Sequence, residues 1–119
     1  MTSPAAERFA ISFAAAFSSG QLKRVLDHYC ADAVLLDRDG REHRGHEAIA
    51  RVYRPLLGLD LRMVIKPRFA AEQRNVAILS NDFEVLKGDD VQFRSTSFEV
   101  LERGLDDTWR LLLDHPYAT

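Results

Sequence analysis

The sequence predicts an α+β domain in which three N-terminal helices pack on one face of a curved, mainly antiparallel sheet. Three observations support this fold class. Apolar residues recur at helical spacing in the first half of the chain, they alternate in the manner of strands over residues 59–115, and short polar turns separate the expected strands. Such short connections join antiparallel neighbours, because a parallel return needs a crossover of a dozen or more residues.

Composition narrows the class of protein further. The 119 residues are expected to form one domain spanning 1–119, since no internal repeat or linker interrupts them. Sixteen Lys and Arg residues against eighteen Asp and Glu residues give a net charge of −2, which disfavours nucleic acid or an anionic membrane as a partner. No run reaches the roughly twenty apolar residues that a membrane span needs. The single cysteine, Cys30, excludes an internal disulfide and favours a reducing, cytoplasmic location.

The first expected helix begins at Pro4, with Ser3 as a suitable N-cap. Phe9, Phe13 and Phe17 recur at i, i+4 and i+8, which places them on one face of that helix. This apolar run also resembles a secretory signal, but it lacks the basic region that such a signal carries. We therefore interpret it as a helix that faces the core.

A second helix is expected to follow, with Leu22, Val25, Leu26 and Tyr29 on its apolar face. The pattern then changes. Residues 33–37 are short, apolar and followed closely by an Asp-Gly pair, which predicts a strand that enters a turn.

Gly45 opens the third expected helix, whose apolar face includes Tyr53. Pro55 removes a backbone hydrogen bond and crowds the preceding turn, so we expect this helix to kink or end there. The alternating half of the chain then predicts a meander of four strands, at about 59–71, 74–86, 91–103 and 108–115.

Four segments carry a more specific signal. They read FSSGQL at 17–22, YCADAV at 29–34, RGHEAI at 44–49 and WRLLLDH at 109–115. In this order they resemble the nuclear-transport-factor-two-like superfamily, also called the cystatin-like cone fold, and its SnoaL-like and ketosteroid-isomerase-related small domains. The resemblance covers essentially the whole chain and implies a conical, mostly apolar pocket between helices and sheet. It leaves the function open, because the superfamily holds isomerases, cyclases, dehydratases and non-catalytic domains.

Asp37 is the first candidate catalytic residue. It closes an apolar strand and shares its parity with Leu35, so we expect it to face the pocket with a raised pKa, as a general base requires. The resemblance also places Asp37 where ketosteroid isomerases carry their catalytic aspartate. The alternative is that Asp37 caps the turn that follows it. The oxyanion-hole tyrosine and aspartate of those enzymes fall on Phe13 and Thr96, so the resemblance implies that both donors are missing.

His115 is the second candidate catalytic residue, because histidine can shuttle protons near neutral pH. Successive strand residues point to opposite faces, so only one of Asp114 and His115 is expected to line the pocket, and the sequence leaves open which one. His115 could instead hydrogen-bond at the end of the strand. Tyr29 and Tyr53 either present hydroxyl groups to the pocket or pack in the core, and Arg94 could meet an anionic substrate. The expected substrate-binding residues are thus Phe13, Tyr29, Tyr53, Arg94, Thr96 and Asp114.

Two kinds of function remain open at this stage. One is a cofactor-independent isomerase, cyclase or dehydratase that acts on a hydrophobic substrate by Asp/His proton transfer. The other is a non-catalytic domain for ligand binding or homo-oligomeric assembly. The sequence has no Gly-rich phosphate loop, nucleophile elbow or recognised metal-ligand spacing. We therefore expect no cofactor, no metal and a small, neutral, hydrophobic ligand rather than a nucleotide or a phosphorylated metabolite.

The expected sheet also predicts a homodimer. In the strand at 91–103, Phe93 and Leu101 share one parity whereas Phe98 and Val100 share the other. A sheet with only one buried face would alternate cleanly between apolar and polar residues. An apolar outer face of this kind favours a two-fold partner.

Overall fold

A computed structural model describes residues 4–118. This part of the chain confirms the predicted α+β class. Its elements are α1 (Pro4–Ser18), α2 (Leu22–Leu26), β1 (Tyr29–Leu36), β2 (Glu42–Arg44), α3 (Gly45–Leu57), β3 (Arg62–Gln73), β4 (Val76–Lys87), β5 (Asp90–Arg103) and β6 (Trp109–His115).

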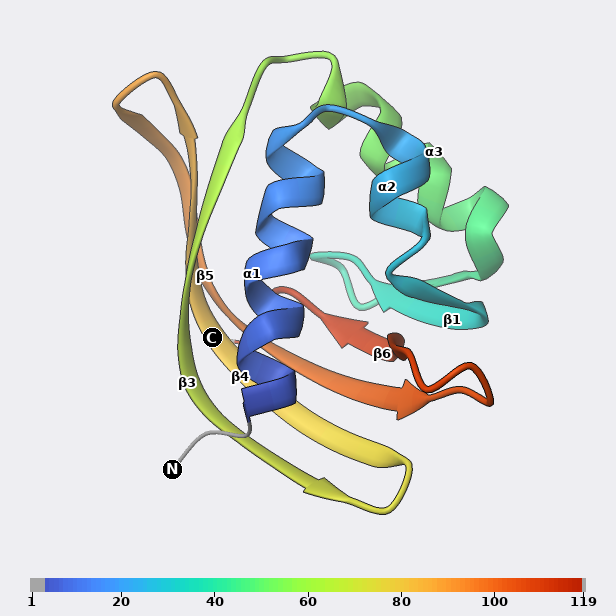
Figure 1. Cartoon of the computed structure of the whole chain (residues 1–119). Coiled ribbons are helices and arrows are strands. Elements are labelled where there is room, and N and C mark those ends of the chain that lie inside the picture. The colour runs from blue at the N-terminus through green and yellow to red at the C-terminus, as the bar shows by residue number, and fades with distance from the viewer. Residues whose placement is uncertain (1–3, 119) are drawn as a thin grey trace.

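The strands form one sheet in the order β2-β1-β6-β5-β4-β3. Strands β3 to β6 make the predicted antiparallel meander, whereas β1 runs parallel to β6 and antiparallel to β2. The long strands curve around α1, and α2 and α3 lie at the end of the sheet beside β1 (Figure 1). The helices therefore cover the concave face, and the convex face carries no helix among the described residues.

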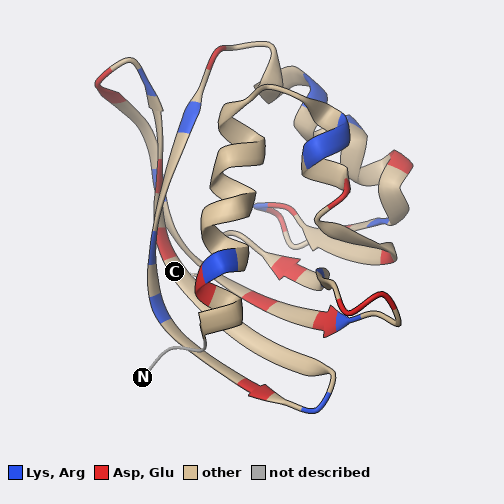
Figure 2. Ribbon diagram, viewed as in Figure 1, with Lys and Arg blue, Asp and Glu red and all other residues tan. Residues whose placement is uncertain are grey.

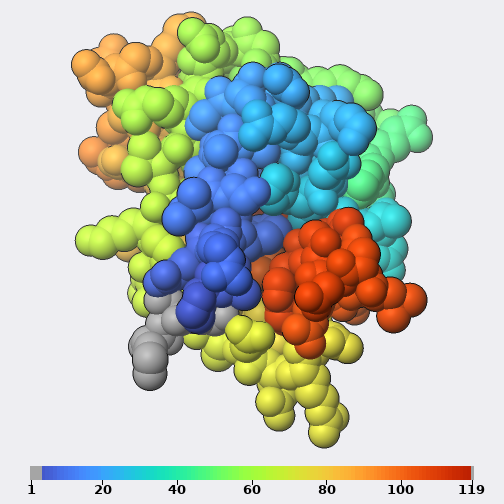
Figure 3. Space-filling model, viewed as in Figure 1, coloured from blue at the N-terminus to red at the C-terminus, as the bar shows by residue number. Residues whose placement is uncertain are grey.

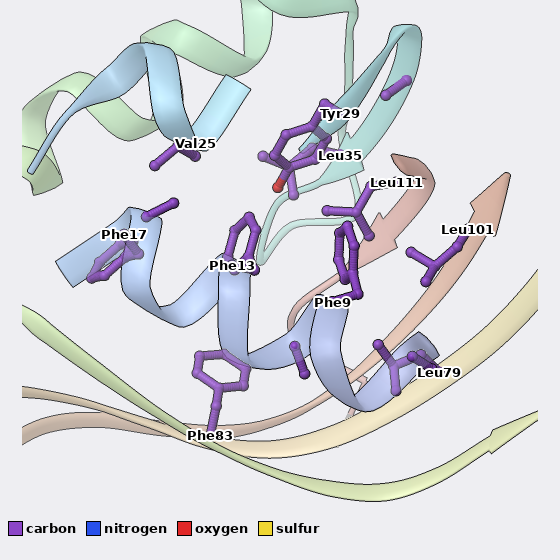
Figure 4. Packing of buried hydrophobic residues seen from close by; sticks show 14 of the residues in the cluster. Phe9, Phe13, Phe17, Val25, Tyr29, Leu35, Leu79, Phe83, Leu101 and Leu111 are labelled. Carbon is purple, nitrogen blue, oxygen red and sulfur yellow. The ribbon is translucent and has the colours of Figure 1, made fainter. Parts of the chain in front are cut away.

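The aromatic face of α1 explains why this helix occupies the concavity. Phe9, Phe13 and Phe17 are all buried, as their spacing predicts. The close view shows Phe9 and Phe13 on the side of α1 that faces Leu111 and Tyr29, with Phe83 of β4 directed toward the helix from its other side (Figure 4). Burial of four such rings supplies a large part of the driving force for packing helix against sheet. The predicted N-cap, Ser3, lies outside the described residues.

The segment after α1 differs from the sequence-based prediction. α2 ends at Leu26, and Tyr29 begins strand β1 instead of completing a helical face. Tyr29 is aligned with Leu111 in the parallel β1–β6 pair, and the Leu111 N–H donates to the carbonyl of His28 at 2.8 Å. Pairing with β6, which is distant in sequence, overrides the helical spacing of the local residues, because a helix of only five residues is weakly stable by itself.

Two smaller differences concern β2 and Pro55. The sequence analysis did not predict β2, which is short and pairs with the end of β1. α3 continues to Leu57 beyond Pro55, where it was expected to kink or end. Pro55 removes the one bond that its N–H would have donated to the Arg51 carbonyl, but only two residues of α3 follow it, so the interruption falls at the end of the helix.

A β-bulge in β6 decides which face each of its residues occupies. The register with β5 shifts between Val100 and Leu101, so Leu112 has no direct partner across the pair. Leu111 and Asp114 consequently both face the concave side and line the pocket. Strict alternation would have placed these two residues on opposite faces.

Candidate active site

An apolar pocket of about 320 Å³ lies between α1, α3 and the concave face of the sheet. Its volume is at the lower end of the roughly 300–1,000 Å³ typical of small-molecule sites. The space-filling view shows α1 closing the concave side between β3 and the β5–β6 turn (Figure 3). Charged residues are distributed over the strands, the turns, α2 and α3, whereas α1 carries them only near its start (Figure 2). The apolar walls include Phe9, Phe13, Leu35, Ile65, Leu79 and Phe83.

Two carboxyl groups face each other within these apolar walls. Glu99 of β5 and Asp114 of β6 are direct partners in the antiparallel pair, and both line the pocket. Glu99 is 6% exposed and Asp114 is 7% exposed. Glu99 was not among the candidates from the sequence, although it shares the parity of the buried Leu101, a signal that could have identified it.

A chain of two tyrosine hydroxyls holds Asp114. The Tyr29 hydroxyl donates to Asp114 Oδ2 at 2.5 Å and lies 2.7 Å from the Tyr53 hydroxyl. Since the single proton of Tyr29 is used by Asp114, the Tyr53 hydroxyl donates to Tyr29. Burial raises the pKa of both tyrosines well above 10.0, so both remain protonated donors. Tyr29 comes from β1 and Tyr53 from α3, so the fold brings three distant segments to one carboxylate.

Glu99 has its own set of polar partners. Ser97 Oγ donates to both oxygens of Glu99, and Asn81 Nδ2 donates to Glu99 Oε1 at 3.2 Å. Asn81 lines the pocket and is 3% exposed, yet its Oδ1 has no hydrogen-bond partner among the described residues. A buried acceptor left open in this way is uncommon in proteins and points to a donor that the chain itself does not supply.

The two carboxyl groups have different acidities. Burial, followed by the charge of Asp114, raises the pKa of Glu99 from 4.5 to about 8, although hydrogen bonds from Ser97 and Asn81 oppose the shift. Burial raises the pKa of Asp114 from 3.8 to about 6, and the hydrogen bond from Tyr29 limits the rise. Near pH 7 the pair therefore shares about one proton, and Glu99 is the more readily protonated member. Such a pair can supply a base and an acid in one pocket.

Asp37 behaves differently from the sequence-based expectation. It lines the mouth of the pocket, but its carboxylate accepts hydrogen bonds from the N–H groups of Asp39 and Arg41 at 2.8 and 3.0 Å. His43 Nε2 lies 3.0 Å from the other carboxylate oxygen. The bond with His43, followed by these N–H groups, lowers the pKa of Asp37 below 3.8. The expected rise in pKa is therefore wrong, and the alternative, a turn-capping aspartate, describes its contacts.

Three other candidates lie away from the pocket. Arg94 pairs with Glu84, and Thr96 Oγ1 donates to Asp82 Oδ1 at 2.7 Å, both across the outer face of the sheet. His115 is aligned with Phe98 of that same outer face. Expecting these three residues in the pocket was wrong. In β5 the side chains of Ser97 and Glu99 face the pocket, so those of Arg94 and Thr96 face outward. In β6 the bulge turns Asp114 inward and His115 outward.

The remaining candidates do meet at the site. Phe13, Tyr53 and Asp114 line the pocket, and Tyr29 reaches it through its hydroxyl group. Within residues 4–118, no three His, Cys, Asp or Glu side chains converge closely enough to hold a metal ion. None of the helices described has the length and apolarity needed to cross a membrane.

Comparison with solved structures confirms the cone fold. A ketosteroid isomerase-like protein from Erwinia carotovora atroseptica superposes with a TM-score of 0.74 at 18% identity, covering 93% of this chain and 91% of that chain. An NTF2-like protein with a cystatin-like fold from Novosphingobium aromaticivorans has a TM-score of 0.76 at 14% identity, covering 91% and 75%. A protein from Thiobacillus denitrificans, described as a calcium/calmodulin-dependent protein kinase type II association domain, has a TM-score of 0.78 at 21% identity, covering 97% and 94%. At these identities the likeness establishes the fold alone.

Sequence comparison supplies the family. No curated protein matches this chain. The SnoaL-like domain, in contrast, matches residues 10–105, which is most of the chain. Together with the cone fold and its apolar pocket, this match shows that the protein belongs to the SnoaL-like domain family.

Proposed function

We propose that this protein is a cofactor-independent isomerase or cyclase that moves a proton on a hydrophobic carbonyl compound. The observation that carries the proposal is the Glu99–Asp114 pair, two opposed and buried carboxyl groups that hold about one proton between them at pH 7. Pairs of titratable groups whose environments separate their pKa values are typical of acid–base sites. This pair takes the place of the Asp37 and His115 pair expected from the sequence.

Asp114 is the base in this proposal. Its ionised carboxylate keeps one oxygen, Oδ2, bound to Tyr29 and can remove a proton from the carbon next to a carbonyl group with the other. The C–H electron pair moves into the new carbon–carbon double bond of an enolate, and Asp114 becomes protonated. Returning this proton to a different carbon of the conjugated enolate completes an isomerisation. Attack of the enolate carbon on a second carbonyl instead forms an alkoxide, which takes the proton from Asp114 and completes a cyclisation.

Glu99 is the acid. As a neutral carboxylic acid it can donate a hydrogen bond to the enolate oxygen as negative charge develops there. Phe13, which lies where the resemblance places an oxyanion-hole tyrosine, cannot donate such a bond. Glu99 therefore supplies from β5 the donor that α1 lacks. The open Asn81 Oδ1 can accept a hydrogen bond from a hydroxyl group of the ligand.

The test is proton exchange on a bicyclic apolar ketone. Purified protein in D₂O should catalyse deuterium exchange at the α-carbons of 2-tetralone, followed by ¹H NMR at neutral pH. Asp114→Asn, which keeps the shape and an acceptor for Tyr29, should reduce the rate about 10²- to 10⁴-fold.

Asp37→Asn is the matched control, since it changes the aspartate at the mouth and should retain the wild-type rate. Exchange that survives in Asp114→Asn, or that is lost in Asp37→Asn instead, would overturn the assignment of the base. Binding of 2-tetralone without any exchange in the wild type would refute catalysis and leave a binding protein.

A second candidate function is assembly, and one observation favours it. Phe69, Ile78, Phe98 and Leu113 form an outer apolar patch on the convex face, each at least 37% exposed. The centres of the Phe69 and Phe98 rings lie 6.3 Å apart. Ile78 and Leu113 lie on either side of Val100 of β5, which is aligned with both of them in the sheet. An exposed apolar patch of this kind is unusual for a monomer.

A second copy of the chain is the occupant we propose for this patch. The charges that flank it, including the Arg94–Glu84 and Arg68–Asp82 pairs, balance one another, so an identical surface meets no net repulsion. The similar Thiobacillus denitrificans protein is itself described as an association domain.

Sedimentation velocity at micromolar concentration should give about twice the 13.5 kDa chain mass. Phe98→Glu should give the monomer, whereas Leu105→Glu, at a fully exposed position in the β5–β6 turn, should not. A monomeric wild type, or a Phe98→Glu variant that remains dimeric, would refute this interface.

A further inference from the structure

Arg38 lies at the mouth of the pocket, two residues after the end of β1, and its position is defined by two aromatic rings. Its guanidinium carbon lies 4.5 Å from the centre of the Phe93 ring and 5.3 Å from that of Tyr117. These two rings meet edge to face at 5.5 Å. Stacking on aromatic faces orients a guanidinium group while leaving its N–H donors free.

The segment that carries Tyr117 is itself anchored to β5. Ser95 Oγ donates to the carbonyl of Pro116 at 2.7 Å, and the Ala118 N–H donates to the carbonyl of Thr96 at 2.8 Å. Arg38, Phe93, Pro116 and Tyr117 all line the pocket. The mouth therefore has a preformed rim of aromatic side chains that fixes the position of the cationic Arg38 side chain.

No carboxylate of residues 4–118 forms an ion pair with Arg38. Its two neighbours in sequence are both aspartates: Asp37 is already bound to His43 and to two backbone N–H groups, and Asp39 forms no ion pair with Arg38. Of the twelve other arginines of the described chain, six pair with an Asp or Glu and six do not, but Arg38 is the one that lines the pocket. Arg38 is thus a cation at a pocket mouth whose hydrogen-bonding capacity toward an anion is unused.

The pocket consequently has two chemically different ends. Glu99 and Asp114 make one end acidic, the walls between are apolar, and Arg38 places a positive charge at the opening. A negatively charged group would be repelled by Asp114 and would lose its hydration at the acidic end, whereas at the mouth it stays partly hydrated and meets a guanidinium fork. A ligand with a single anionic group is therefore oriented with that group outward.

We propose that Arg38 is a specificity-determining residue that selects apolar monocarboxylates, binding the carboxylate at the mouth while the apolar body reaches the Glu99–Asp114 end. This inference deepens the proposed function and rests on it for the reacting end of the ligand. It adds a carboxylate to the neutral ligand that the sequence predicts. A carboxylate fits better than a phosphate, because one guanidinium matches its charge and its two oxygens, and Asp37 nearby would oppose a dianion.

The experiment compares two ligands that differ only at the charged group, 1-naphthylacetate and 1-naphthylacetamide. Titration calorimetry at low ionic strength should show the wild type binding the carboxylate at least about tenfold more tightly than the amide. Arg38→Met, which keeps an apolar chain over the rings, should remove this preference without weakening the amide. Arg41→Met, an exposed arginine in the same turn that does not line the pocket, is the matched control and should keep the preference.

Several results would overturn the proposal. In the wild type, these are equal or tighter binding of the amide, and no binding of either ligand. In the variants, they are a preference for the carboxylate that survives in Arg38→Met, and a preference that is lost from Arg41→Met as much as from Arg38→Met. Because this measurement involves no proton transfer, it is independent of the exchange test on 2-tetralone. A protein that binds the carboxylate through Arg38 but fails to exchange the ketone would retain this site and lose the proposed catalysis.

Discussion

Replacing Glu99 by glutamine should make the protein more stable at high pH. Burial and the neighbouring Asp114 raise the pKa of Glu99 from 4.5 to about 8 in the folded protein. A group whose pKa is raised on folding stabilises the fold fully below its unfolded pKa, and this contribution is lost as the pH rises through the folded pKa. For Glu99 the free energy of unfolding therefore falls mainly between pH 4.5, where the group ionises in the unfolded chain, and pH 8, where it ionises in the folded protein.

The magnitude follows from the two pKa values. Relative to a group with an unshifted pKa, Glu99 lowers the free energy of unfolding by about 1 kcal/mol at pH 5 and about 4 kcal/mol at pH 8. Glu99→Gln removes this penalty and keeps an acceptor for Ser97. Its amide oxygen can also still accept a hydrogen bond from Asn81 Nδ2. The variant should therefore gain on the order of 3 kcal/mol over the wild type between pH 5 and pH 8.

Urea unfolding at pH 5, 6, 7 and 8, followed by Trp109 fluorescence, measures this difference, and unchanged m-values would license the comparison. Glu102→Gln, an exposed position of the same strand, is the matched control and should follow the wild type at every pH. If the wild-type and Glu99→Gln curves run parallel over this range, Glu99 has an ordinary pKa and the proton-sharing pair does not exist.

Three further predictions concern other parts of the fold. Tyr29→Phe removes the donor to the buried Asp114 carboxylate and should cost about 2 kcal/mol in urea unfolding at pH 7, with a smaller loss at pH 5 where Asp114 is protonated; an equal loss at both would contradict it. Asp37→Asn should lower the melting temperature at pH 7, and this effect should shrink only as the pH falls below 3.8 and through the lowered pKa of the folded Asp37; a pH-independent effect would exclude the contacts with His43 as the cause. Gly45→Ala should destabilise by about 1 kcal/mol in thermal unfolding, since Gly45 has a φ of 83°; an unchanged melting temperature would show that α3 can begin without that conformation.

The sequence predicted best the elements that depend on near neighbours. Phe9, Phe13 and Phe17 identify α1 because a helix brings residues four apart to one face. The meander was predictable because alternation and short turns specify antiparallel strands without further information. Tyr29 was misplaced on a helix because its strand conformation depends on pairing with β6, whose residues come some eighty positions later.

The site was harder to predict than the fold, because it depends on parity and on distant pairs. Asp37 was favoured by its position after an apolar strand, but turn contacts with His43 and two backbone N–H groups control its charge. The resemblance placed Thr96 in the pocket, but its neighbour Ser97 is the residue that lines it. A shift of one residue along a strand moves a side chain to the opposite face of the sheet. Glu99 was overlooked for the same reason.

The sequence by itself determined the fold class, the aromatic face of α1, the meander and the family of the protein, since periodicity and motif order are properties of the chain. Only the tertiary structure decided that Asp114 rather than His115 faces the pocket, because a bulge at Leu112 reverses the parity of β6 and no local pattern marks it. The tertiary structure also decided that Glu99 lies opposite Asp114 and that the Tyr29 hydroxyl donates to the Asp114 carboxylate. The acidity of a buried carboxyl group depends on the groups that surround it in space, and around this pair those groups come from β1, α3, β4, β5 and β6.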